Sequence, residues 1–184
     1  MKNLKINNRK GIVFWITGLS GSGKTRLGHK IKKSIIKNYG PTILFSGDDI
    51  RNIFEFKKYS LKDRLKIVTG YSRLCYNLSN QGINIIFCVV GLMHSIHKWN
   101  RKNIKNYIEI YIKSPLNKVK KLSKKKIYKQ KYIQNVVGFD IKPEFPKKPN
   151  IIINNNFSKS LDKLSKELLT KINKATKLNN RISR

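Results

Sequence analysis

The chain alternates between short apolar runs and longer segments in which apolar residues recur at helical spacing. The apolar runs are residues 11–17, 42–45, 83–90, 107–113 and 151–154. Continuous runs of this length are typical of strands that are buried on both faces of a sheet. Strands that alternate with helices form parallel sheets that the helices cover. The pattern therefore predicts an α/β fold, a five-stranded parallel sheet with helices on both faces.

The segments between these runs carry helix signals. Apolar residues four positions apart predict a helix directly after the first strand, namely Leu27, Ile31 and Ile35. Ser60, followed three residues later by Asp63, has the form of a capping box and predicts the start of a long helix that ends at Gln81-Gly82. Further helices are predicted over residues 95–104, from Pro115 onward and over residues 161–172.

Residues 127–149 are basic, irregular and rich in proline, which predicts a lid-like binding loop rather than a simple connection. A chain of 184 residues suits one compact domain, and we expect residues 1–176 to form it. Residues 177–184 are expected to be a frayed basic tail.

The chain is strongly basic, with 41 Lys and Arg against 9 Asp and Glu and a formal net charge of +32. Such a charge raises nucleic acid or an anionic membrane as a partner. The lysines, however, are spread through predicted strands and loops alike, whereas a nucleic-acid site concentrates them in a stripe with interleaved aromatic residues. We therefore favour compositional drift as the source of the charge, with a generally anionic substrate as the alternative, and expect no specific nucleic-acid partner.

The two cysteines, Cys75 and Cys88, lie in apolar segments and are expected to be small buried thiols rather than a disulfide framework. The longest apolar run, residues 83–93, is shorter than the roughly 20 residues of a membrane helix. The N-terminus lacks the apolar stretch of a signal peptide. These features predict a cytoplasmic protein with no membrane partner.

Residues 18–25 read GLSGSGKT and satisfy the P-loop pattern G-x-x-x-x-G-K-[ST], between a predicted strand and a predicted helix. Glycines allow a tight turn whose N–H groups point at phosphate oxygens, and the helix adds its positive end. Lys24 can reach the β and γ phosphates, and the Thr25 hydroxyl can ligate Mg²⁺. The expected phosphate-binding residues are Gly18, Leu19, Ser20, Gly21, Ser22, Gly23, Lys24 and Thr25.

A second candidate site, SGDDIR, follows the second strand directly, at the edge of a parallel sheet where ligands bind. Asp48 or Asp49 could accept a proton from a substrate hydroxyl or hold a metal-bound water. For Asp49 we favour the simpler role of capping the helix that follows. Arg51 lies one helical turn further and could pair with a substrate phosphate or sulfate.

The segments FWITGLSGSGKT, SGDDIR, YSLKDR and VVGFDIKPEFPKKP together resemble adenylyl-sulfate kinase, a family with the P-loop NTPase fold. The resemblance implies that MgATP phosphorylates the ribose 3'-hydroxyl of adenylyl sulfate, with Lys24 and Asp48 as catalytic residues. It also implies a homodimer and four acceptor-binding positions, Arg51, Tyr59, Arg64 and Lys125, of which Lys125 lies in the segment that closes over the site.

The chain departs from the family pattern on the acceptor side. Ser46 replaces the first Asp of Asp-Gly-Asp, Tyr59 a Phe, Ile67 an Asn and Val136 the Phe that stacks on adenine. The Ile-Ser-Pro-Tyr-Arg segment is also missing, with VGLMHSIHKWNR in its place. Losing an aromatic stack on a base costs about 1–3 kcal/mol. Tyr59, Trp99 or Phe139 could supply a replacement ring.

These departures leave several functions open. The leading interpretation is an adenylyl-sulfate kinase. KWNRKNIKNY and NVVGFDI, however, are similar to kinase-like proteins found with capsule genes, which resemble a cytidine diphosphoramidate kinase that also phosphorylates a 3'-hydroxyl. Alternatives of other classes are a basic P-loop ATPase that binds nucleic acid and an inactive family member that serves as a partner-binding subunit.

Overall fold

The computed structural model describes residues 10–56, 60–122 and 135–180, with side chains as far as Thr176. Its five strands are β1 (Val13–Thr17), β2 (Thr42–Ser46), β3 (Asn84–Val89), β4 (Tyr107–Lys113) and β5 (Ile151–Asn154). They form one sheet in the order β2-β3-β1-β4-β5, and every neighbouring pair is parallel. The predicted five-stranded parallel sheet is confirmed.

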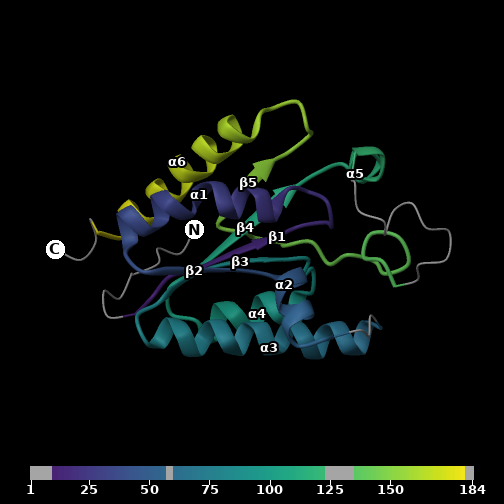
Figure 1. The fold of residues 1–184 in the computed structure, drawn as a ribbon, viewed down its shortest axis with the longest axis horizontal. Coiled ribbons are helices and arrows are strands. Elements are labelled where there is room, and N and C mark those ends of the chain that lie inside the picture. The colour runs from purple at the N-terminus through teal and green to yellow at the C-terminus, as the bar shows by residue number, and fades with distance from the viewer. Residues whose placement is uncertain (1–9, 57–59, 123–134, 181–184) are drawn as a thin grey trace.

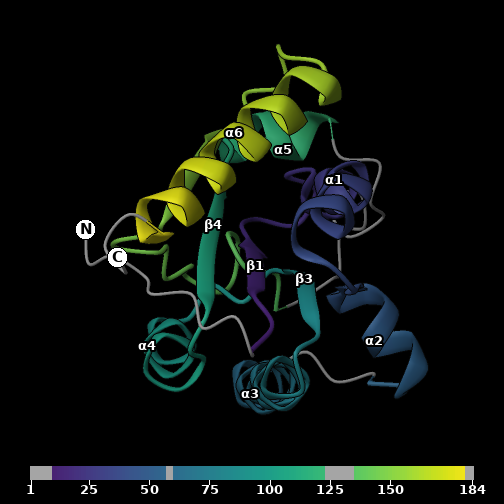
Figure 2. The same ribbon diagram turned by 90° about the vertical axis from the view of Figure 1, so that its left-hand side faces the viewer.

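Helices cover both faces of the sheet (Figures 1 and 2). On one face lie α1 (Lys24–Tyr39) and α6 (Leu161–Asn180), and on the other lie α3 (Leu61–Asn80) and α4 (His94–Asn103). Two short helices, α2 (Gly47–Ile53) and α5 (Leu116–Leu122), lie toward the carboxyl ends of the strands. The α/β layering that the sequence pattern predicted is therefore present.

The central strand β1 is buried along its whole length because each face of the sheet has its own apolar core. Phe14 and Ile16 belong to the core beneath α1 and α6. Trp15 belongs to the opposite core, where its ring stacks on Phe87 with centroids 5.3 Å apart. A strand that is buried on both faces needs a continuous apolar run, which explains why the sequence of β1 does not alternate.

The predicted start of α3 is also confirmed. The Ser60 hydroxyl accepts a hydrogen bond from the Asp63 backbone N–H at 3.2 Å and donates one to the Asp63 carboxylate at 2.5 Å. The helix ends at Gln81, as the Gln81-Gly82 pair predicted.

Residues 135–150 contain no helix or strand apart from an isolated bridge between Val137 and Ile141, in agreement with the predicted irregular loop. Residues 127–134 of that loop lie outside the described part of the chain. At the other end, α6 continues to Asn180, so the first residues of the predicted tail are helical. The single domain remains a prediction.

Two further expectations concern the chain as a whole. Both cysteines are free and buried, and burial raises the pKa of the Cys88 thiol to about 12. Across residues 10–56, 60–122 and 135–180, no helix combines the length and the apolar character that crossing a membrane requires.

We predict opposite effects on stability for two Gly→Ala substitutions in helices. A Cβ atom at Gly28 in α1 would lie 2.6 Å from the Cys88 sulfur, so Gly28→Ala should lower the free energy of unfolding by about 1–3 kcal/mol. A Cβ at Gly70 in α3 meets no atom within 4 Å, so Gly70→Ala should raise it by about 1 kcal/mol. Urea unfolding followed by circular dichroism measures both, and effects of the same sign would contradict the packing at Gly28.

Candidate active site

The P-loop joins β1 to α1 and adopts a conformation that depends on glycine. Gly18 has a φ of +148°, and a Cβ atom there would lie 2.6 Å from the Ile112 carbonyl oxygen. Gly23 immediately precedes α1 and has a left-handed φ of +89°. Other residues would strain the backbone at both positions, so the predicted tight turn is present.

The Lys24 side chain lies within this loop and is almost completely buried. Its ammonium group donates a hydrogen bond to the Leu19 carbonyl oxygen at 2.6 Å and lies 3.5 Å from the Ser22 hydroxyl. The loop thus holds a cation at its centre, where the N-terminal end of α1 adds further positive potential.

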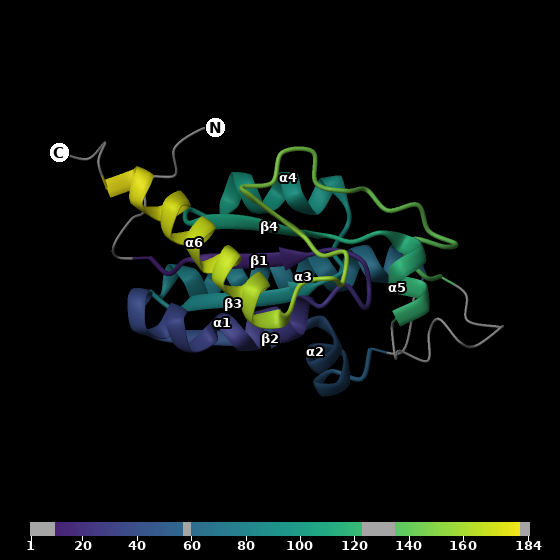
Figure 3. The same cartoon turned by 90° about the horizontal axis from the view of Figure 1, so that it is seen from above.

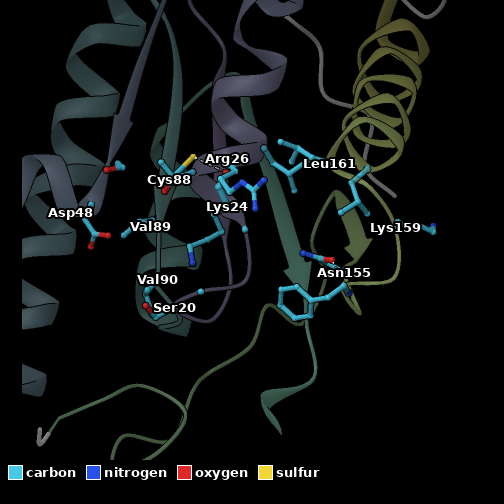
Figure 4. A pocket seen from close by; sticks show the side chains of 18 residues that line it. Ser20, Lys24, Arg26, Asp48, Cys88, Val89, Val90, Asn155, Lys159 and Leu161 are labelled. Carbon is cyan, nitrogen blue, oxygen red and sulfur yellow. Dashed lines mark hydrogen bonds between the residues drawn. The ribbon is translucent and has the colours of Figure 1, made fainter. Parts of the chain in front are cut away.

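A cavity of about 680 Å³, here called the P-loop cavity, opens beside Lys24. Figure 4 shows Lys24 between Asp48 on one side and Asn155, Lys159 and Leu161 on the other. The remaining walls come from α1 and from the carboxyl end of β3. The cavity therefore lies at the carboxyl edge of the sheet, where parallel α/β folds bind ligands.

Asp48 is placed by the cap of α2. The helix begins at Gly47, and the Ser46 hydroxyl accepts a hydrogen bond from the Asp49 backbone N–H at 3.1 Å. The prediction that Asp49 is the cap is therefore wrong. Ser46 takes that role because it is extended and precedes the helix, which leaves Asp48 in the first turn as a wall residue of the P-loop cavity.

A second cavity of about 1090 Å³, here called the α3 cavity, lies next to the first. Its walls come from α2, α3, the β3–α4 connection and residues 136–144. The two cavities share part of their lining, namely Ser20, Gly47, Asp48, Val89 and Val90. The Asp48 carboxylate therefore lies at the junction of the two cavities.

Both predicted acceptor arginines that the structure describes line the α3 cavity. An Arg64 N–H donates to the Asn135 carbonyl oxygen at 2.6 Å, and an Arg51 N–H lies 3.3 Å from the Phe56 carbonyl oxygen. Two consecutive helices, α2 and α3, thus present two cations to one cavity. Tyr59 and Lys125 lie outside the described residues.

Two of the three aromatic residues considered as replacements for the missing stack lie elsewhere. Trp99 packs edge-on against Tyr76, with centroids 6.2 Å apart, and the Phe139 ring lies 3.9 Å below the Lys120 ammonium. Neither is among the described lining residues of the α3 cavity, whereas Val136 is. Ile67 packs against the core beneath α3 and α4.

Tyr71 is the aromatic residue among the described side chains that line the α3 cavity. Its ring packs against Phe87 with centroids 5.0 Å apart, and the residue is only 4% exposed. The α3 cavity thus has an aliphatic wall at Val136 where the family pattern has an aromatic ring.

Sequence reasoning missed the residues that follow β5. The Asn155 amide donates to the Ser22 carbonyl oxygen at 3.0 Å and accepts from the Phe157 backbone N–H at 3.1 Å. Asn155 and Phe157 both line the P-loop cavity. The signal was available, because a run of three asparagines begins at the last residue of β5, at the edge where ligands bind.

The described residues fit a magnesium ion that arrives with a nucleotide. They contain no group of three or more His, Cys, Asp or Glu side chains that could hold a metal by themselves. Thr25 and Asp48 both line the P-loop cavity, and Mg²⁺ is usually held by one or two side-chain oxygens together with phosphates and water. The metal-binding role of Thr25 remains a prediction.

Comparison with known proteins assigns the chain to a family. Residues 10–154, more than half of the chain, match the family model for adenylylsulphate kinase. The chain belongs to this family. The resemblance in the sequence is confirmed, and the chain is an ATP-dependent kinase with the P-loop NTPase fold.

Individual relatives have two different names. The chain is 30% identical over 163 residues to the cytidine diphosphoramidate kinase of Campylobacter jejuni, covering 87% of this chain and 95% of that protein. It is 29% identical over 175 residues to the adenylyl-sulfate kinase of Buchnera aphidicola, covering 92% and 84%. Family membership therefore establishes a kinase without specifying its acceptor.

A solved structure supports the fold. The APS kinase CysC of Mycobacterium tuberculosis, in complex with AMPPNP and APS, superimposes with a TM-score of 0.79 at 20% sequence identity. The match covers 89% of this chain and 98% of that one.

We predict that Asn155 supports the P-loop and thereby nucleotide binding. Asn155→Ala removes the donor to the Ser22 carbonyl, and we expect the dissociation constant of a non-hydrolysable ATP analogue to rise about tenfold. The matched control is Asn154→Ala, at the exposed end of β5, which should bind as the native chain does. Calorimetric titration measures both dissociation constants. Equal affinities for the two variants would refute the role of Asn155 in supporting the P-loop.

Proposed function

We propose that this kinase transfers the γ-phosphoryl group of ATP to the ribose 3'-hydroxyl of a cytidine nucleotide, cytidine diphosphoramidate. The observation that carries the proposal is the pair of cavities that meet at Asp48, one beside the P-loop and one with an aliphatic wall at Val136.

The P-loop cavity is the proposed donor site. The triphosphate of ATP lies along residues 18–25, where backbone N–H groups and the Lys24 ammonium stabilise the negative charge on the transferring group. Thr25, which lines the same cavity, would hold the Mg²⁺ that accompanies ATP and neutralises its phosphates.

The α3 cavity is the proposed acceptor site. The acceptor's 3'-oxygen forms a new bond to the γ-phosphorus as the bond from that phosphorus to ADP breaks. Asp48 lies at the junction, where its carboxylate orients the hydroxyl and takes up its proton. The Arg51 and Arg64 guanidinium groups pair with the anionic phosphates of the acceptor.

The wall of the α3 cavity favours a pyrimidine acceptor. An adenine acceptor would lose the aromatic stack that the family's Phe supplies, at a cost of about 1–3 kcal/mol, because Val136 stands there instead. A cytosine ring is smaller and depends less on stacking area. The match along 95% of the Campylobacter jejuni cytidine diphosphoramidate kinase supports the same choice.

Adenylyl sulfate is the second candidate acceptor. A cavity of about 1090 Å³ has room for a purine nucleotide, and the Buchnera aphidicola relative is named for that activity. The reaction, the donor site and the role of Asp48 would be the same for both acceptors.

Other features of the protein follow the same proposal. We attribute the charge of +32 to composition rather than to nucleic-acid binding. We also propose a cytoplasmic protein with one domain that ends near residue 176 and that forms a homodimer.

We predict a preference for the cytidine acceptor. In an ADP-release assay at equal concentrations, kcat/KM for cytidine diphosphoramidate should exceed that for adenylyl sulfate by about tenfold or more, the equivalent of one lost aromatic stack. A preference for adenylyl sulfate would overturn the cytidine assignment and leave the kinase reaction intact. Turnover of neither nucleotide would overturn the proposed function.

We predict that two neighbouring carboxylates differ sharply in importance. Asp48→Asn should lower kcat about 10²–10⁴-fold, because the group that takes up the hydroxyl proton is lost. Asp49→Asn changes the charge by the same amount, but only the backbone of Asp49 has an identified role, so kcat should stay near the native value. Comparable losses in the two variants would show that local charge, not the position of Asp48, supports turnover.

A further inference from the structure

A cluster of polar side chains lies buried between α4 and β4. Glu109 stands in β4 between the apolar residues Ile108 and Ile110, and its side chain has no exposed surface. The carboxylate pairs with the Arg101 guanidinium and faces the imidazole of His97, which is also buried. Because apolar residues in place of a buried ionic cluster often stabilise a fold, this cluster calls for a role other than stability.

The contacts of His97 show where hydrogens are needed in the cluster. The Nε2 atom lies 2.8 Å from the Gly91 carbonyl oxygen, which can only accept, so Nε2 carries a hydrogen. The Nδ1 atom lies 3.4 Å from Oε1 of Glu109, and within the described part of the chain both atoms are buried without a hydrogen-bond partner. Without a hydrogen, Nδ1 and Oε1 are both acceptors and cannot form a hydrogen bond with each other. One proton is therefore needed between these two atoms.

The electrostatics agree on where that proton lies. Burial lowers the pKa of His97 to about 4 and raises the pKa of Glu109, although Arg101 opposes the second shift. Burial thus favours the neutral forms of both groups, and a proton on Oε1 of Glu109 would be donated to Nδ1 while the other oxygen accepts from Arg101.

The cluster reaches one wall of the α3 cavity through Gly91. Residues 90–93, which connect β3 to α4, form that wall. His97 lies behind the wall and holds the Gly91 carbonyl through its Nε2–H group. The position of the wall thus depends on a side chain that is not among the described lining residues.

The same cluster also contacts the segment that forms a second wall, at residues 148 and 150. Arg101 donates to the Lys148 carbonyl oxygen at 2.9 Å, and the Glu109 backbone N–H donates to the Asn150 side chain at 2.8 Å. Both residues lie at the end of the segment 135–150, which passes beside α4 (Figure 3). Residues 136–144 of the same segment line the cavity.

The two walls also touch directly at Glu144. Its backbone N–H donates to the Leu92 carbonyl oxygen at 3.1 Å, and its carboxylate accepts from the His94 backbone N–H at 2.6 Å. Glu144 therefore joins the segments 90–94 and 136–150 at the cavity, and the cluster of His97, Arg101 and Glu109 joins the same two segments behind it.

We propose that His97 and Glu109, together with Arg101, are positioning residues that set the spacing of the two walls of the α3 cavity and thereby the affinity for the acceptor. The proposal rests on the proposed function in that it takes the α3 cavity as the acceptor site. The His97 and Arg101 side chains act through the backbone of Gly91 and Lys148, and the Glu109 carboxylate lies between these two side chains. A displacement of about 1 Å in either wall is enough to disturb the placement of a bound substrate.

The kinetic test compares two substitutions at His97. His97→Ala removes the link to Gly91, and we expect the KM for the acceptor to rise about tenfold while the KM for ATP stays within about twofold of native. His97→Gln can still donate to the Gly91 carbonyl and should restore most of the acceptor affinity. The matched control is Ile96→Ala, which removes a buried side chain from the same helix but no hydrogen bond to either wall.

A substitution at Glu109 tests the shared proton. Glu109→Gln supplies an amide N–H to Nδ1 of His97 and an oxygen to Arg101, so its acceptor KM should lie within about twofold of native. Glu109→Ala should raise that KM at least as much as His97→Ala does. A large rise of the acceptor KM in Glu109→Gln would overturn the inference that Glu109 and His97 share a proton.

Amide hydrogen exchange of the complete chain without substrates tests the positioning independently of activity. In His97→Ala, amides of residues 89–94 and 136–150 should exchange faster than in Ile96→Ala, whereas residues 18–25 should be unchanged. Faster exchange confined to α4, or equal in both variants, would overturn the proposal. If the native chain phosphorylates neither cytidine diphosphoramidate nor adenylyl sulfate while both walls loosen, the proposed function fails and the positioning role stands.

Discussion

The burial of β1 on both faces is the constraint on which the site depends. Because β1 lies between β3 and β4 at the centre of the sheet, its carboxyl end can only continue into the P-loop at the middle of the molecule. The order β2-β3-β1 then brings the carboxyl ends of β2 and β3 to the same edge, with Asp48 after one and residues 90–93 after the other. The two cavities meet at Asp48 as a consequence of strand order.

Sequence patterns predicted the features that are local. The five strands, the P-loop and the Ser60 cap each depend on residues within a few positions of one another. The Asp49 cap was wrong because Ser46 and Asp49 both suit that role, and only the backbone shows where α2 begins. Trp99 and Phe139 were considered as replacements for the missing stack because sequence cannot show which cavity, if any, a ring lines.

The pattern of apolar and polar residues could not predict contacts between segments that are distant in the sequence. The Asn155 amide reaches Ser22, and the Arg64 guanidinium reaches Asn135, across more than half and more than a third of the chain respectively. Glu109 was visible in the sequence, because it is a charged residue within the apolar run of YIEIYIK, whose other charge lies at its last residue, Lys113. Its partners His97 and Arg101 belong to the preceding helix, and nothing in their spacing indicated the pairing.

The P-loop and the α3 cavity differ in what holds them in place. The P-loop is positioned by glycine backbone and by the strand it continues, so little freedom remains for change there. Two walls of the α3 cavity, residues 90–93 and 136–144, are irregular segments that are held by a few hydrogen bonds to side chains such as Glu144, His97 and Arg101. Segments held in this way can be reshaped without disturbing the sheet. A kinase family can therefore keep one phosphoryl-transfer apparatus while the walls of a neighbouring cavity change, and residues 90–93 and 136–144 are the segments of this chain where such change costs least.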